Sequence, residues 1–468
     1  MLVLIGTFLV LALIGLPIAI SMLGASALYI LLYGAASDLI IAQRLIASIG
    51  SFPLLAVPFF ILAGNVMNAA GVTDRINRFA MSLVGWMRGG PAHVNIVASV
   101  VFSGMSGSAL ADAAGIGTMQ IKAMTDRGYP VETAVGVTAA SATLGPILPP
   151  SLPIIIFGMV TNVSVGALFI AGLMPGLLMT VLMMLMVFVL AFRKGWQRDT
   201  AFDLRSLGGS IVEILLVVAF PIAIYLLVSA GLNANIAIGS ALALLLILDV
   251  IFSFSAVLAL LTPVLLIGGM TLGWFTPTEA AVAAVVWSLF LGLVRYRALT
   301  LPTLTRSVMN TIETTASVLF IVGAASVFAW LLTVSQATQV LTGGLLGITE
   351  NRFVFLLLVN LILLVVGAFL DTTAAITILG PILIPMAASY GIHPVQLGIV
   401  FTLNLMIGLL TPPVGMILFV MARITNMPVE QAIRAVLPWL IPLLIALAVI
   451  TLIPAVTLWL PTHLGLIR

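Results

Sequence analysis

Residues 143–153 read TLGPILPPSLP, and residues 407–415 read IGLLTPPVG. Each stretch places a glycine shortly before a Pro-Pro pair, within sequence that is otherwise apolar enough to cross a membrane. Proline removes a backbone N–H donor and interrupts a helix, and glycine frees the backbone. Because an unpaired backbone group in hydrocarbon costs several kcal/mol, a broken helix persists there only where it lines a protected cavity. The two stretches therefore predict two interrupted helices at membrane depth, each with free carbonyl oxygens.

The composition of the chain is that of an integral membrane protein. Of its 468 residues, 62% are hydrophobic and 7% are charged, and the mean hydropathy is +1.33. Soluble domains carry about 25% charged residues, and a β-barrel would show alternating segments of about ten residues. The chain instead contains long apolar runs near the roughly 20 residues that a spanning helix needs. They predict an all-α polytopic fold in the lipid bilayer and lie at 2–33, 166–192, 211–230, 353–370 and 436–460.

Motifs of soluble enzymes are absent from the sequence. There is no P-loop, so the chain does not itself hydrolyse ATP. There is no cysteine, and the three histidines, at 93, 393 and 463, are scattered rather than clustered as metal ligands. We therefore expect no enzymatic activity, no organic cofactor and no nucleic-acid partner. Energy for any uphill transport then comes from an ion gradient or from a partner protein.

Basic residues divide the chain and predict its orientation. Lys and Arg accumulate in cytoplasmic loops, so the basic segment 193–207 is expected to be a cytoplasmic linker. It separates a first half, 1–192, from an apolar helix pair, 208–254, and a second half, 255–468. About four spans are expected between this segment and the next basic cluster, so both clusters lie on the same side. The second cluster consists of Arg295, Arg297 and Arg306.

The two halves carry the same pattern at an offset of 263 residues. Pro149 and Pro150 correspond to Pro412 and Pro413, and Gly145 corresponds to Gly408. Repeats in opposite orientation are common in secondary transporters, which hold their sites between the repeats near the membrane midplane. We expect each half to contain a re-entrant helical hairpin followed by a broken helix. The hairpins are expected near 104–126 and 371–390, and the broken helices over 133–158 and 395–422.

The expected hairpin tips are rich in small and hydroxyl-bearing residues, in SGMSGSALAD (103–112) and DTTAAIT (371–377). Asp371 ends a deep apolar run, where a charged side chain costs about 2.5–3.5 kcal/mol. A small hard cation, held by carbonyl and hydroxyl oxygens, would offset that cost. A cap on a helix that begins at Thr372 is an alternative role for Asp371, and the two roles are compatible. For Asp112, a cap on a helix beginning at Ala113 is favoured over contact with an ion.

Two further polar positions have structural explanations. In FTPTEAA (275–281), Thr276 is placed as a helix N-cap, Pro277 as the first helical residue and Glu279 as the partner in a capping box. Asn65 and Asn68 lie in an apolar helix, where an Asn side chain usually forms an interhelical hydrogen bond. Lining the substrate path is the alternative role for these two residues.

Several motifs together resemble one transporter family over nearly the whole chain. They are PFFILAGNVMN (58–68), SGSALADAAGIG (106–117), RGY (127–129), TLGPILPPSLP (143–153), FTPTEAA (275–281), FLDTTAAITILGPILIP (369–385) and IGLLTPPVGMILFV (407–420). In these motifs the chain resembles the large membrane subunit of TRAP (tripartite ATP-independent periplasmic) transporters.

The resemblance implies a sodium-coupled importer of small organic acids that works by an elevator motion in the bacterial inner membrane. It also implies two partners, a periplasmic solute-binding protein and a small four-helix membrane subunit. Carried over to this chain, one sodium site involves Ser106, Ser108, Thr143, Gly145 and Pro149. The other involves Asp371, Thr372, Thr373, Gly408, Thr411 and Pro412. Substrate contacts are expected between the two sites, at Ser106, Gly107, Asn65, Pro150, Thr373 and Pro413.

One segment departs from the family pattern. An apolar block at 213–252 intervenes where the family passes almost directly from the basic loop to the next helix, and it fits two extra spans. We expect this pair to augment the scaffold next to the small subunit. Two alternatives to the coupled importer stay open: a related sodium/anion symporter without a binding protein, and a membrane scaffold without coupled transport.

Overall fold

The first half folds into helices only. The structure is a computed structural model that describes residues 2–34, 39–50, 52–196, 198, 202–252, 254, 256–271, 274–336, 339, 342–343 and 349–467. The predicted apolar run 2–33 is two helices rather than one, because the chain turns at Gly15 to Pro17. The helices up to the basic segment are α1 (Leu2–Leu13), α2 (Ile18–Tyr33), α3 (Leu39–Ile49), α4 (Ala56–Ala69), α5 (Val72–Val84), α6 (Gly90–Ser106), α7 (Ala109–Ala114), α8 (Ile116–Thr125), α9 (Val131–Ala142), α10 (Leu152–Thr161) and α11 (Val165–Arg193).

The rest of the chain continues in the same way, and no strand occurs in the described residues. A short π-helix, Phe290–Arg295, extends α15. The helices are α12 (Leu204–Ser229), α13 (Ala234–Phe252), α14 (Val257–Thr271), α15 (Pro277–Leu289), α16 (Leu301–Val334), α18 (Arg352–Phe369), α19 (Thr372–Ser389), α20 (Pro394–Gly408), α21 (Met416–Thr425), α22 (Val429–Val436), α23 (Leu440–Leu452) and α24 (Ala455–His463).

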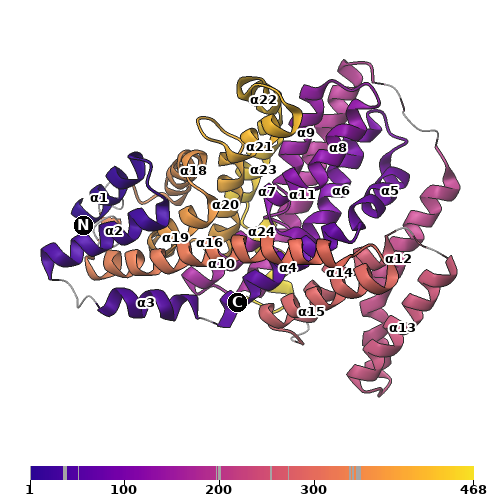
Figure 1. Cartoon of the computed structure of the whole chain (residues 1–468), viewed down its shortest axis with the longest axis horizontal. Helices are drawn as coiled ribbons and strands as arrows, with labels where there is room; N and C mark the ends of the chain where they lie inside the picture. The colour runs from indigo at the N-terminus through magenta and orange to yellow at the C-terminus, as the bar shows by residue number, and fades with distance from the viewer. Residues whose placement is uncertain are drawn as a thin grey trace.

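The helices are long and apolar enough for a polytopic membrane protein. Among the described residues, seven helices qualify as membrane spans by length and composition, and the bent pair of α4 and α5 makes an eighth if it is one span. The axes of this pair differ by 72°. The all-α polytopic prediction is therefore confirmed. Figure 1 shows the long helix α16 running across the molecule, from α1 to α3 at one end to α14 and α15 at the other.

Two helical hairpins precede the two broken helices. The first has its tip at Gly107, between α6 and α7, and Asn95 of α6 reaches Met124 of α8 along its arms. The second has its tip at Leu370 and Asp371, between α18 and α19. The ranges expected from the sequence, 104–126 and 371–390, cover only the tip and the second arm of each. Their first arms, α6 and α18, read as ordinary apolar helices.

Both expected helix interruptions are present. Helices α9 and α10 are separated by residues 143–151, and α20 and α21 by residues 409–415. Both Pro-Pro bonds, Pro149–Pro150 and Pro412–Pro413, are cis. The first interruption is buried, whereas Pro412 and Pro413 are exposed in the second. The reason is that α11 passes over the first: a Cβ atom on its Gly176 would clash with the side chain of Leu148.

The helix pair α12 and α13 packs against the first half and α14. Glu213 of α12 is buried, and its carboxylate accepts the backbone N–H of Ala256 at 2.9 Å. Asp249 of α13 is 2% exposed and pairs with Arg295 at 2.6 Å. The outward faces of both helices are apolar. The pair is therefore attached by buried polar contacts on one side and presents hydrocarbon on the other.

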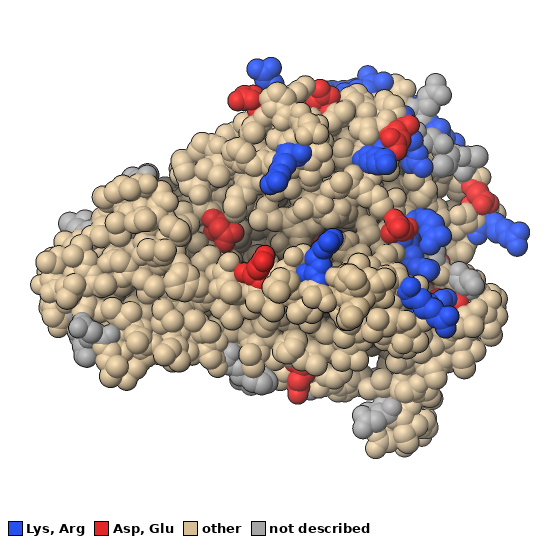
Figure 2. Space-filling view, in the orientation of Figure 1, with Lys and Arg blue, Asp and Glu red and all other residues tan. Residues whose placement is uncertain are grey.

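Charged residues are distributed unevenly over the surface. Figure 2 shows most Lys, Arg, Asp and Glu side chains over the upper and right-hand parts of the molecule, a few near the centre and the lower edge, and almost none over the left-hand end formed by α1 to α3. The right-hand part contains the basic segment after α11 and the region around α14. Because Lys and Arg accumulate on the cytoplasmic side, the basic residues of this part are expected to face the cytoplasm.

Candidate functional site

The two hairpin tips meet at one polar cavity. Its volume is about 250 Å³. The first tip contributes Gly107 and Ser108, the second contributes Asp371, Thr372 and Thr373. The other lining residues come from α7, the first helix interruption, α10, α16, α20 and the second interruption: Ala109, Leu110, Pro146, Leu152, Pro153, Ile156, Thr314, Ser317, Val318, Ile321, Met406 and Leu409. Residues from the two halves of the sequence thus share one concave site.

A buried carboxylate lies behind the first tip. Asp112 is 1% exposed, and one of its oxygens accepts a hydrogen bond from the hydroxyl of Ser106. Its other oxygen, Oδ2, has no hydrogen-bond partner among the described residues. The expectation that Asp112 caps a helix beginning at Ala113 is wrong. Ser108 caps that helix instead, by accepting the N–H of Ala111 at 3.4 Å, and this leaves Asp112 inside the first turns.

The first tip and the first helix interruption fit directly together. Gly107 has a φ of +62°, and a Cβ atom there would lie 2.5 Å from the carbonyl oxygen of Pro150. The carbonyl of Gly107 in turn accepts the N–H of Leu152 at 3.2 Å. Only glycine combines this positive φ with such an approach at low cost. The tip is therefore joined to the Pro-Pro segment by main-chain contact.

The first interruption supplies oxygen atoms near the carboxylate. A Cβ atom on Gly145 would clash with the carboxylate of Asp112, so the backbone at Gly145 faces that group. The hydroxyl of Thr143 donates to the carbonyl of Ala140 at 2.6 Å. Among the described residues, no hydrogen bond reaches the carbonyl oxygens of Thr143, Gly145, Pro149 or Pro150. Ser106, Asp112 and Gly145 are thus brought together.

The second tip begins a helix that faces the same cavity. Asp371 is the N-cap of α19, and its carboxylate accepts the N–H of Thr373 at 2.9 Å. The capping role expected as an alternative is confirmed. Thr372 and Thr373 are buried, at 6% and 9% exposure. The tip therefore presents one carboxylate and two hydroxyl groups at the start of a helix.

The second interruption reaches the cavity lining only at Leu409. Gly408 is tightly packed, since a Cβ atom there would lie 2.6 Å from the Cα of Gly367 in α18. The hydroxyl of Thr411 donates to the carbonyl of Ile407 at 2.8 Å. Gly408, Thr411, Pro412 and Pro413 do not line the cavity that Asp371 faces.

Asn65 links the site to the long helix. Its side-chain amide donates to the hydroxyl of Thr311 in α16 at 2.9 Å, which confirms the interhelical hydrogen bond. It also lines a second hollow of about 100 Å³ with Ser106, Ser108 and Thr314. Ser108 and Thr314 line both hollows. Asn65 is therefore in place for both roles considered from the sequence.

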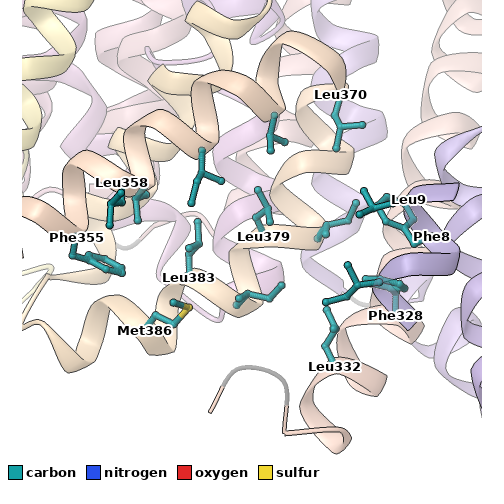
Figure 3. Close-up of a pocket in the computed structure, with 16 residues that line it drawn as sticks. Phe8, Leu9, Phe328, Leu332, Phe355, Leu358, Leu370, Leu379, Leu383 and Met386 are labelled. Carbon is teal, nitrogen blue, oxygen red and sulfur yellow. The ribbon is translucent and has the colours of Figure 1, made fainter. Parts of the chain in front are cut away.

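A third cavity is chemically unsuited to an ion or an organic acid. It has a volume of about 600 Å³ and is lined by apolar side chains alone, from α1, α16, α18 and α19. Figure 3 shows these side chains converging between the arms of the second hairpin, with Phe8 and Phe328 at one end and Phe355 at the other. With no polar group to hold a charged ligand, this cavity is a place for hydrocarbon rather than for a charged solute.

The capping box at α15 is confirmed. Thr276 accepts the N–H of Glu279, and the carboxylate of Glu279 accepts the N–H of Thr276 at 2.8 Å. Glu279 thus stabilises a helix start and does not line the polar cavity. No cluster of three or more His, Cys, Asp or Glu occurs in the part of the chain that the structure describes. A cation bound at the polar cavity would therefore need carbonyl and hydroxyl oxygens among its ligands.

Comparison with known proteins identifies the family. The family model described as "Tripartite ATP-independent periplasmic transporter, DctM component" matches residues 5–255 and 251–456. The chain belongs to this family. The large permease protein SiaM of a sialic acid TRAP transporter from Vibrio cholerae is 41% identical over 447 residues, which cover 96% of this chain and 95% of the relative. DctM of a C4-dicarboxylate TRAP transporter from Pseudomonas aeruginosa is 36% identical over 442 residues, with 94% of each chain covered.

Membership of the TRAP family confirms three expectations. The relatives are named as transporter permeases rather than enzymes, and the protein is a multi-pass protein of the inner membrane. The family that the sequence motifs resemble is also the family whose model matches the chain. The fold is also similar to the crystal structure of the Alcanivorax borkumensis YdaH transporter. The TM-score is 0.57 at 16% identity, with 88% of this chain and 87% of that chain covered.

Proposed function

We propose that this TRAP permease imports a small carboxylate solute together with sodium ions. The observation that carries the proposal is the convergence of both hairpin tips on one polar cavity, with the buried carboxylate of Asp112 directly behind the first tip. A carboxylate without a compensating charge is costly inside a membrane. The unpartnered Oδ2 of Asp112 and the backbone carbonyl oxygens around Gly145 that accept no hydrogen bond are suitable ligands for a small hard cation.

The first sodium site is assigned to the first tip and the first interruption. Ser106, Thr143, Gly145 and Pro149 supply hydroxyl and carbonyl oxygens, Ser108 flanks them, and Asp112 adds the negative charge that the sequence-based assignment omitted. A bound sodium ion neutralises the carboxylate and contributes about 2.3 kcal/mol for each charge that crosses 100 mV. The residues keep water out because the whole first interruption is buried.

The second sodium site is assigned to the second tip and the second interruption. The side chains of Asp371, Thr372 and Thr373 supply oxygens at the start of α19. The carbonyl groups of Gly408, Thr411 and Pro412 supply the others, at the end of α20 and in the second interruption, where Gly408 packs against α18.

The solute is proposed to bind between the tips. Sialic acid and C4-dicarboxylates, after which two relatives are named, carry carboxylates. The N-terminus of α19 at the cavity favours an anion through its free N–H groups. Ser106, Gly107, Asn65, Pro150 and Thr373 lie at or next to the two hollows, whereas Pro413, the sixth residue expected to contact solute, lies outside both linings.

The proposed cycle needs two further proteins. A periplasmic binding protein delivers the solute, and a small membrane subunit completes the scaffold, in which α12 and α13 present an additional apolar face. The repeats are proposed to have inverted orientation. The two hairpins with their broken helices then slide as one body against the long helices, as in an elevator.

Uptake by reconstituted protein tests the proposal. The permease and its small subunit are placed in vesicles with the binding protein outside, and uptake of labelled sialic acid and of succinate is measured. We expect accumulation only with an inward sodium gradient and only with the binding protein present. Accumulation without the binding protein would favour a sodium/anion symporter that works without a binding protein. Flux insensitive to sodium would favour a membrane scaffold without coupled transport. Either result would overturn the proposal.

A further inference from the structure

Helix α16 carries a polar stripe that extends from the polar cavity beyond the proposed sodium and solute sites. With 3.6 residues per turn, five polar residues of this helix fall within an arc of about 100°. All five are exposed. They are Arg306, Asn310, Glu313, Thr314 and Ser317, and this set is called the α16 stripe below.

The α16 stripe is poorly suited to contact with lipid. A charged side chain within a membrane span costs roughly 2.5–3.5 kcal/mol. Arg306 and Glu313 form no ion pair with any residue that the structure describes. The adjoining exposed face of the same helix is apolar, with Val308, Met309 and Ile312 exposed by 39%, 52% and 55%. Lipid is therefore expected on the apolar face and water on the stripe.

The stripe continues directly from the polar cavity. Thr314 and Ser317 line the cavity together with Asp371 and Ser108. From Ser317 to Arg306 the stripe extends over eleven residues, or about 16 Å along the helix axis. Asn65 fixes this part of the helix through its hydrogen bond to Thr311. One polar surface thus leads from the space between the hairpin tips to Arg306.

The far end of the stripe lies on the basic side of the molecule. Arg306 follows Arg295 and Arg297, and four helices, α12 to α15, separate this cluster from the basic segment 193–207. An even number of spans returns the chain to the same side. The charges on the right-hand part of Figure 2 agree with this placement. The stripe therefore runs from mid-membrane towards the cytoplasmic surface.

We propose that the α16 stripe is one wall of a water-filled path along which the anionic solute leaves the cavity for the cytoplasm. Arg306 supplies positive charge at its mouth. The proposal rests on the solute site described above, but it does not depend on which ion drives transport. Asn310, Thr314 and Ser317 offer hydrogen bonds to a carboxylate or hydroxyl group along the way.

The absence of native cysteine makes a direct test simple. Single variants Asn310→Cys, Thr314→Cys and Ser317→Cys are compared with Val308→Cys, Met309→Cys and Ile312→Cys on the neighbouring face. The permease, in complex with its small subunit, is placed in inside-out vesicles and treated with a charged, membrane-impermeant methanethiosulfonate. We expect the stripe positions to react at least tenfold faster than the controls. Equal rates on both faces, or unreactive stripe positions because lipid or the small subunit covers them, would overturn the proposal.

A second measurement isolates Arg306. In the Thr314→Cys background, the rates of an anionic and a cationic reagent of similar size are compared. Arg306→Gln is expected to lower the anionic-to-cationic rate ratio several-fold, and Arg306→Lys to keep it. An unchanged ratio with Gln would remove Arg306 from the path. Labelling needs neither sodium nor uptake. The labelling rates therefore test the solute path even if the uptake experiment rejects sodium coupling.

Discussion

Ser108 and Asp371 lie 263 residues apart in the sequence, yet each caps the first turn of a helix at a hairpin tip, and both line the same polar cavity. The same offset relates the two Pro-Pro pairs. The residues at the two positions differ in charge, since one is a serine and the other an aspartate. The first hairpin carries its acid four residues later, at Asp112, behind the tip rather than in the cavity.

Asp112 is expected to raise the affinity for sodium. Asp112→Asn keeps the shape of the side chain and a hydrogen bond to Ser106 but removes the charge. Sodium is expected to raise the unfolding temperature of the purified protein. In the variant, the sodium concentration that gives half of the maximal rise should increase at least tenfold, which corresponds to about 1.4 kcal/mol of binding free energy. The measurement is thermal unfolding in sodium chloride against choline chloride. Asp126→Asn, at an exposed acid, serves as the control and should leave the sodium response unchanged.

Two variants of Asp371 separate its capping role from its charge. Asp371→Asn keeps a cap on α19, whereas Asp371→Ala loses the cap as well, at about 1 kcal/mol of stability. If the charge binds sodium, both variants lose sodium-dependent uptake and only the alanine variant is less stable. Normal sodium-dependent uptake by the asparagine variant would show that the residue acts as a cap alone.

Gly107 is expected to be essential for joining the first tip to the Pro-Pro segment. Gly107→Ala introduces a Cβ atom 2.5 Å from the Pro150 carbonyl oxygen at a φ of +62°. The left-handed conformation alone costs about 1–2 kcal/mol. Gly128→Ala is the matched control, because Gly128 has a φ of +81° and no atom within 4 Å of such a Cβ. Thermal unfolding in detergent should show a larger loss at Gly107, and equal losses would contradict the tight fit.

Gly408 is expected to set the spacing between α18 and α20. Gly408→Ala places a Cβ atom 2.6 Å from the Cα of Gly367, where only a backbone shift relieves the clash. We expect a lower unfolding temperature and weaker sodium stabilisation, because the shift moves the second interruption. Gly239→Ala, in α13 with open space around it, should be neutral or more stable by up to about 1 kcal/mol. Similar effects of the two changes would argue against the close contact.

The pair of Asp249 and Arg295 is expected to hold α13 in place. Asp249→Asn leaves Arg295 without its partner, and breaking a buried pair costs about 3–5 kcal/mol, less here because Arg295 is 26% exposed. A double-mutant cycle with Arg295→Gln measures the interaction free energy. Additive effects of the two changes would show that the ion pair contributes nothing to the position of α13.

Much of the architecture follows from the sequence because local chemistry decides it. The helix interruptions at 143–151 and 409–415 follow from proline and glycine, whose backbone effects need no partner. The capping box at Thr276 and Glu279 follows from residues three positions apart. The apolar runs mark helices, because only a helix satisfies every backbone group in lipid.

Other features depend on contacts between distant residues, and only the tertiary structure decided them. The capping residue of α7 is Ser108 and not Asp112, because the tip turns earlier than composition indicates. The first interruption is wholly buried, whereas Pro412 and Pro413 of the second are exposed, because α11 crosses only the first, although both have the same local pattern. The α16 stripe becomes a candidate solute path only because folding brings Thr314 and Asp371 into the lining of one cavity. A sequence specifies where a chain bends or caps, but burial and charge compensation are properties of the neighbours that folding brings to each residue.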